Sequence, residues 1–251
     1  MGCLRPLRPG DSFCAYCGPS SGVPTFQIAS PALPAASGRF AANWSEFKRV
    51  GWLFGSLLSC SLVLGLVARS GNNAWPIAIA TAVDALLAVG FAITRFEDIR
   101  PLLYWPWADA TRLWQAVAVV VAFFVLMPSY FAMLRHFGAP FARLSAPFLS
   151  AHWPIWSIYA LISLAPAIFE ELAFRGVIQS ALARLIQPRE AWLIQAALFS
   201  ILHLSPVIFP SHFVMGLCLG FLRWRLKSLY PGMLLHASWN ALVIHQELLV
   251  L

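Results

Sequence analysis

The chain has few charged residues for its length. Of its 251 residues only 11% are Asp, Glu, Lys or Arg, whereas 60% are hydrophobic. Soluble domains have about a quarter of their residues charged, which keeps the surface hydrated. This deficit excludes an ordinary soluble globular protein, and we expect most of the surface to face lipid.

Acidic residues are scarcer than basic ones, and the formal net charge is +7. A basic protein that binds nucleic acid gathers its Lys and Arg residues into a patch or stripe. Here these residues stand between apolar runs, as they do in the loops of a membrane protein. The charge therefore indicates membrane topology, and no nucleic-acid partner is expected.

Cysteine is also sparse, and the five cysteines form no secreted disulfide framework, since Cys60 and Cys218 lie inside apolar runs. The N-terminal cysteines Cys3, Cys14 and Cys17 resemble part of a zinc knuckle, because a CxxC turn suits a tetrahedral metal. No fourth Cys or His lies nearby. We interpret these three thiols as a degenerate or intermolecular site.

Long apolar runs fill the rest of the sequence. A helical span needs about 20 residues, so we expect an all-α, polytopic transmembrane helix bundle of about seven spans with a flexible N-terminal leader. The predicted spans cover residues 51–68, 74–94, 113–134, 153–174, 191–204, 207–224 and 229–251. The run 191–204 is short, so it is expected to tilt, break near Pro206 or end within the protein.

The pattern divides the chain into three parts. Residues 1–45, rich in Pro, Gly, Ser and Ala, form a flexible cytosolic leader that lacks a signal-peptide core. Residues 46–150 form N-terminal transmembrane helices, and residues 151–251 form a second set that contains most of the polar motifs. Basic residues in short loops favour the cytoplasm, which predicts a cytoplasmic N-terminus.

Adjacent glutamates mark the first polar motif within the apolar runs. Ionisable residues inside spans are costly, so each is a candidate for function. On a helix, Glu171 and Arg175 are four residues apart and can pair on one face. Glu170 points about 100° away and has no local cation. The spacing predicts one structural carboxylate and one free base, or else a buried ion network that only locks helices together.

Two further motifs supply imidazoles and an amide. His203 follows Phe199 by four residues, and His236 shares a helix face with Asn240. With Glu170 they provide a base, two imidazoles and an amide, which fits water activation and oxyanion stabilisation in amide hydrolysis. Taken singly, the side chain of His203, His236 or Asn240 could instead serve only to form an interhelical hydrogen bond.

In this order the motifs resemble those of the CAAX-processing and bacteriocin-processing (CPBP) intramembrane proteases, which include the Ras-converting CAAX endopeptidases. The signature EExxxR, FxxxH and HxxxN reads here as Glu170-Glu171 with Arg175, Phe199 with His203, and His236 with Asn240. The resemblance covers about residues 153–243 and implies that residues 151–251 are a catalytic CPBP-like core. It implies that Glu171 and Arg175 hold the geometry of the site.

The resemblance also implies roles for the remaining site residues. Glu170 would activate a water molecule with His203, and His236 with Asn240 would stabilise the tetrahedral oxyanion. The sequence has no HExxH helix or other three-ligand zinc motif, so we expect a glutamate-dependent hydrolase with no cofactor. Zinc held by Glu170, His203 and His236 is the alternative.

The implied function is an intramembrane endopeptidase that acts near the C-terminus of a membrane-associated or lipidated protein or peptide. Its expected location is the bacterial inner membrane, where lipids surround a multi-pass chain. Two alternatives stay open. One is a non-catalytic bacteriocin-immunity or scaffold membrane protein. The other is a transporter or channel, motivated by Asp84 within the second predicted span.

Five residues outside the three motifs are interpreted separately. His212 and His245 are interpreted as loop or interface residues. Gly216 and Gly220 form a GxxxG pattern, which indicates close helix packing. For Asp84 the sequence leaves two environments open, an arginine from another helix or a wet cavity.

Overall fold

The computed structural model describes residues 13–14, 18–19, 36–69, 73–105, 109–141 and 143–249. The chain forms two units, Met1–Phe40 and Ala41–Leu251. In the first, strands β1 (Phe13–Cys14) and β2 (Gly18–Pro19) pair antiparallel. The predicted zinc knuckle lies outside the residues whose side chains are described.

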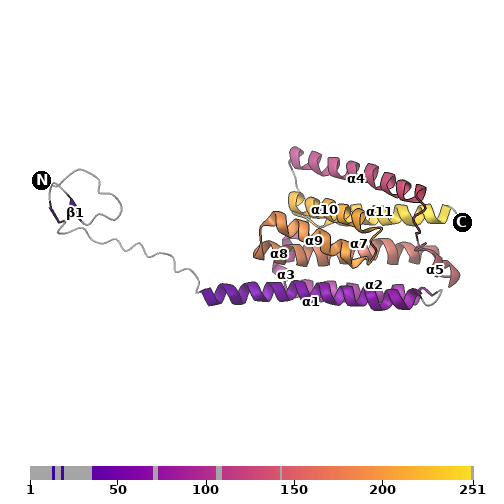
Figure 1. Ribbon diagram of the computed structural model, residues 1–251, viewed down its shortest axis with the longest axis horizontal. Helices are drawn as coiled ribbons and strands as arrows, with labels where there is room; N and C mark the ends of the chain where they lie inside the picture. The colour runs from indigo at the N-terminus through magenta and orange to yellow at the C-terminus, as the bar shows by residue number, and fades with distance from the viewer. Residues whose placement is uncertain are drawn as a thin grey trace. The chain divides into compact units, whose positions relative to one another are not determined.

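The rest of the described chain is helical, as predicted (Figure 1). The first helices are α1 (Ala36–Arg69), α2 (Trp75–Ile93), α3 (Phe96–Ile99), the 3₁₀ turn η1 (Arg100–Leu102), α4 (Ala110–His136) and α5 (Ala146–Ser150). They are followed by α6 (Ile155–Ile158), the π-helical segment η2 (Tyr159–Leu164), α7 (Ala165–Glu171), the π-helical segment η3 (Leu172–Ile178), α8 (Gln179–Leu185), α9 (Pro188–Leu202), α10 (Phe209–Leu226) and α11 (Tyr230–Leu249).

Within the described ranges, four helical segments are long and apolar enough to cross a membrane, namely Asn43–Val67, Trp75–Ile93, Ala110–His136 and Ile155–Leu185. The last of these runs through α6, η2, α7, η3 and α8. The other predicted spans are the helices α9, α10 and α11, which do not reach the same length and apolar character. The structure is therefore a polytopic helical bundle, with four candidate spans in place of the predicted seven or so.

The outer faces of the long helices carry large apolar side chains. Trp52 on α1 is 69% exposed, Leu86 on α2 is 74% exposed and Trp114 on α4 is 70% exposed. An apolar surface of this extent drives association in water, whereas lipid tails solvate it. These faces identify an integral membrane protein.

Sequence signals set the ends of the helices near the polar motifs. The side chains of Gln187 and Glu190 form a reciprocal capping box, and α9 begins between them at Pro188. The helix ends at Leu202. The helix that contains the short run 191–204 thus ends before Pro206.

Helices α9 and α10 approach each other closely at a glycine. A Cβ atom added to Gly216 would lie 2.8 Å from Cα of Ala196, a distance that real side chains do not adopt. At Gly220 an added Cβ would lie 2.7 Å from the ring of Trp192. The GxxxG pattern therefore serves close helix packing, as predicted.

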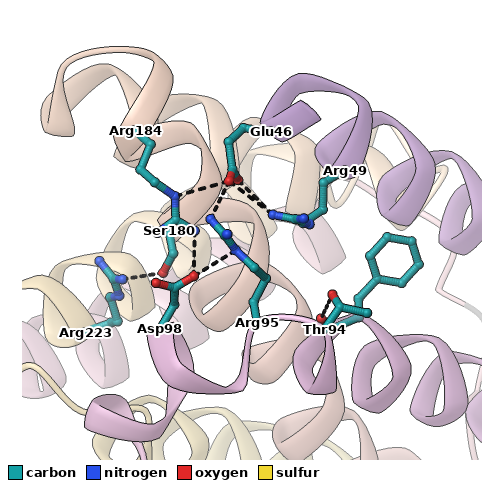
Figure 2. Close-up of polar contacts among 9 residues, drawn as sticks. Glu46, Arg49, Thr94, Arg95, Asp98, Ser180, Arg184 and Arg223 are labelled. Atoms are coloured by element: carbon teal, nitrogen blue, oxygen red, sulfur yellow. Dashed lines mark hydrogen bonds and ion pairs between the residues drawn. The ribbon is translucent and has the colours of Figure 1, made fainter. Parts of the chain in front are cut away.

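An ion network holds together one end of the bundle (Figure 2). Glu46 on α1 hydrogen-bonds to Arg49 at 3.1 Å and to Arg95, the residue before α3. Arg184 on α8 lies 3.5 Å from Glu46 and 3.2 Å from Asp98. Asp98 also pairs with Arg95 at 2.8 Å. The network links α1, α3 and α8 at this end of the bundle.

Candidate active site

A buried ion pair joins α7 to η3. Nη1 of Arg175 donates to Oε1 of Glu171 at 2.8 Å, and the two side chains are 0% and 1% exposed. This is the pair that the four-residue spacing predicts. Nδ1 of His236, on α11, lies 3.2 Å from the same oxygen. A carboxylate oxygen only accepts hydrogen bonds, so Nδ1 of His236 carries the proton.

Glu170 is placed differently from its neighbour. Its Oε2 lies 3.9 Å from Nε2 of His236 and has no hydrogen-bond partner among the described residues. The side chain is 17% exposed, whereas that of Glu171 is 1% exposed. His236 thus lies between a paired carboxylate and a free one. This arrangement fits the division between the two glutamates that the spacing predicts.

Phe199 is the centre around which the motifs gather. Its ring is fully buried, and its centroid lies 5.1 Å from that of His203 and 5.9 Å from that of His236. The guanidinium carbon of Arg175 lies 4.3 Å from the same centroid, within the range of a cation–π contact. Phe199 therefore sets the spacing between side chains from η3, α9 and α11.

His203 is held by its own helix. It follows the last residue of α9, and its Nδ1 lies 2.9 Å from the backbone oxygen of Phe199. A carbonyl oxygen only accepts, so Nδ1 carries the proton and Nε2 has a free lone pair. In this form His203 can accept a proton at Nε2.

Asn240 forms an interhelical hydrogen bond, which is the alternative role considered for it from the sequence, with a partner that the sequence did not indicate. Its Nδ2 donates at 3.1 Å to the backbone oxygen of Ile162, in η2. Close by, Ser163 Oγ donates at 2.8 Å to the backbone oxygen of Ala237. Both bonds tie α11 to the π-helical segment. An amide nitrogen has two hydrogens, so one is available beyond the contact with Ile162.

Glu170 also lines a cavity of about 230 Å³ formed by α1, α2 and α7. A water molecule in the liquid takes about 30 Å³, so the cavity has room for several. Its other polar side chains include Ser61, Thr81 and Asp84. Oδ1 of Asp84 is buried without a hydrogen-bond partner in the described part of the chain. Asp84 therefore lies at a cavity, which is one of the two environments that the sequence leaves open for it.

The zinc alternative can be compared with this geometry. The described residues contain no group of three or more His, Cys, Asp or Glu side chains placed to hold one metal ion. Glu170 and His236 approach each other to 3.9 Å, but His203 does not join them in a shared ligand set. A structural or catalytic zinc needs at least three protein ligands at about 2 Å. In the described structure the three residues that would hold zinc are therefore not gathered into one ligand set.

Comparison with known proteins supports the resemblance carried by the motifs. Residues 151–242 match the Rce1-like family, described as type II CAAX prenyl endopeptidase Rce1-like. This segment contains all three motifs, from Glu170 to Asn240. No curated protein and no solved structure matches the chain. The first 150 residues, including Asp84, lie outside the matched segment.

Proposed function

We propose that this chain, a membrane hydrolase whose residues 151–242 are Rce1-like, cleaves a peptide bond near the C-terminus of a membrane-associated or lipidated protein or peptide. One observation carries the proposal. Glu170 lines a cavity large enough for water, and its Oε2 has no hydrogen-bond partner among the described residues. A free carboxylate beside water inside an apolar bundle suits a general base.

The first step of the proposed reaction uses Glu170 and His203. Glu170 takes a proton from a water molecule, while Nε2 of His203 accepts a hydrogen bond from the same water. The water oxygen forms a bond to the carbonyl carbon of the substrate, whose oxygen becomes an oxyanion. General base catalysis of this kind contributes roughly 10²–10⁴ in rate.

The oxyanion would be stabilised by His236 and Asn240. Because Nδ1 of His236 already donates to Glu171, its Nε2 donates only when the ring is cationic. The carboxylates of Glu170 and Glu171 lie on either side of this ring, at 3.9 Å from Nε2 and 3.2 Å from Nδ1. Asn240 would add its second amide hydrogen. When the intermediate collapses, the C–N bond breaks and the proton on Glu170 passes to the leaving amine.

Glu171 and Arg175 have a supporting role in this scheme. Their buried pair anchors η3 to α7 and orients the imidazole of His236 through Glu171. The reaction as written uses no metal ion. Cleavage is therefore expected to withstand chelators, and loss of turnover that zinc restores would overturn the metal-free mechanism.

The proposal places the protein in the bacterial inner membrane with its N-terminus in the cytoplasm. Arg49, Arg95 and Arg184 gather at one end of the bundle, and positively charged residues of short loops favour the cytoplasmic side (Figure 2). The partners are then membrane lipids and a peptide or protein substrate held at the membrane, with no role for nucleic acid.

The test is cleavage of membrane-anchored C-terminal peptides by the purified protein in lipid vesicles. Glu170→Gln keeps the shape of the side chain and removes the base, so cleavage should fall by roughly 10²-fold or more. Glu97→Gln is the matched control, because Glu97 is exposed on α3. Equal cleavage by the wild type and Glu170→Gln would overturn the proposal.

A further inference from the structure

His212, which belongs to none of the three motifs, lies against His203. Their ring centroids are 3.9 Å apart and their planes differ by 41°. His212 is in the first turn of α10, and its ring centroid also lies 6.2 Å from that of Phe199. The sequence suggests only a loop or interface role. The structure instead places this side chain in the group around Phe199.

Both imidazoles are fixed by the same type of hydrogen bond. Nδ1 of His203 lies 2.9 Å from the backbone oxygen of Phe199, and Nδ1 of His212 lies 2.9 Å from that of Ile208. Each oxygen belongs to the residue four positions earlier. Because a carbonyl only accepts, both Nδ1 atoms carry protons. Each Nε2 is then an unprotonated acceptor in the neutral ring.

Burial lowers the pKa of the His203 ring, and nearby groups that carry or can carry positive charge lower it further. The charged or titratable groups that act on it are His212 from α10, His236 from α11 and Arg175 from η3. All three are cationic or become so on protonation, and each lowers the pKa of His203. Of these groups, His212 has its ring in direct contact with that of His203, at 3.9 Å between the centroids. Two imidazoles at this separation repel each other strongly if both are protonated.

We propose that His212 is a positioning residue of the peptidase reaction, which opposes protonation of His203 and holds its Nε2 ready to accept a hydrogen bond from the reacting water. The inference rests on the proposed function, in which His203 assists Glu170 in activating water. His212 acts through His203 and does not contact the substrate. The chain thus uses a third imidazole from outside the EExxxR, FxxxH and HxxxN signature.

The experiment compares the wild type with His212→Phe and His212→Asn in the same lipid vesicles. Phenylalanine keeps a ring against His203 and Phe199 but removes both nitrogens. Asparagine keeps a donor for the backbone oxygen of Ile208 but removes the ring, so one variant remains informative where the other misfolds. His245→Phe is the control, because His245 is exposed on α11 and belongs to no motif.

The readout is the pH dependence of kcat/KM together with KM. In the His212 variants we expect kcat to fall about tenfold, in line with the loss of one properly held hydrogen-bond acceptor for the water. KM should stay unchanged, and the acidic limb of the profile should move to higher pH, because His203 accepts a proton more readily without its neighbour. His245→Phe should follow the wild type.

A second readout does not depend on turnover. Imidazole ¹⁵N resonances of His203 should report a protonated Nδ1 and a free Nε2 in the wild type, with ring protonation at higher pH in His212→Phe. Unchanged His203 resonances and a pH profile that overlies the wild type would overturn the inference and leave the proposed function intact. Absence of cleavage by the wild type would overturn the proposed function, while the resonances would still decide whether His212 opposes protonation of His203.

Discussion

Nδ1 of His236 lies 3.2 Å from Oε1 of Glu171, the same oxygen that accepts a hydrogen bond from Arg175. This contact links α11 to α7 inside the bundle and fixes which nitrogen of the imidazole carries a proton. The opposite nitrogen faces Glu170 at 3.9 Å. Two glutamates adjacent in sequence therefore lie on two sides of one histidine, and among the described residues an arginine pairs with Glu171 alone.

Glu171→Gln is expected to destabilise the protein. The substitution leaves Arg175, which is 0% exposed, without its counter-charge. Removing one partner of a buried pair costs about 3–5 kcal/mol of unfolding free energy. Equilibrium unfolding in detergent or bicelles measures this loss. The double variant Glu171→Gln, Arg175→Met removes both charges and should recover part of it. If Glu171→Gln alone is as stable as the wild type, the pair has no structural role.

A comparison of the single variants Asn240→Ala and Ser163→Ala separates the structural role of Asn240 from its role as an oxyanion donor. Each removes one hydrogen bond between α11 and η2, so each should lower stability by about 1 kcal/mol. Only Asn240→Ala removes an oxyanion donor, and its kcat should fall by roughly 10²–10³. Thermal unfolding and peptide cleavage are measured on both. Equal activity in the two variants would assign Asn240 to structure alone.

Filling the cavity beside Glu170 should lower kcat/KM without unfolding the protein. Ala80 lines the cavity beside Glu170, and a phenylalanine there takes up the space for water. Ala82→Phe is the matched control, because Ala82 lies on the same helix but is exposed. We expect Ala80→Phe to lose at least tenfold in kcat/KM, in keeping with a displaced nucleophile. Full activity of Ala80→Phe would show that the reacting water lies elsewhere.

Gly216→Ala should push α9 and α10 apart. Its Cβ would lie 2.8 Å from Cα of Ala196, and overpacking of this kind costs about 1–3 kcal/mol. The backbone oxygen of Gly216 accepts from Gln195 at 3.0 Å and Arg175 at 3.4 Å, so activity should fall as well. At Gly55 an added Cβ meets nothing within 4 Å. Gly55→Ala should therefore match or exceed the wild type in thermal unfolding.

The parts of the site that depend on local helix geometry could be predicted from the sequence. The pair of Glu171 and Arg175 is one example, because residues four apart on a helix meet whatever surrounds them. The close packing at Gly216 is another, since a small residue in an apolar helix permits backbone approach. The isolation of Glu170 from local cations follows from the same geometry.

Contacts that depend on tertiary structure or on irregular backbone could not be predicted in this way. His212 meets His203 only because the chain turns between α9 and α10, where Leu204 adopts a positive φ of 50°. Asp84 could be singled out by its cost within a span, but its place in the cavity depends on how α2 packs against α7. The sequence likewise gives no sign that Ile162 offers an oxygen to Asn240.

The π-helical segments η2 and η3, on either side of α7, also change the angular phase of the fourth span. A π turn takes in about one more residue than an α turn, and one residue corresponds to about 100° of rotation. A helical wheel drawn at 3.6 residues per turn across Ile155–Leu185 therefore loses register twice. The span therefore needs three separate helical wheels. One describes the side chains before α7, the second describes Glu170 and Glu171, and the third describes the side chains after η3. Substitutions that restore a regular helix would rotate the two glutamates out of the site, although the sequence would still contain all three motifs.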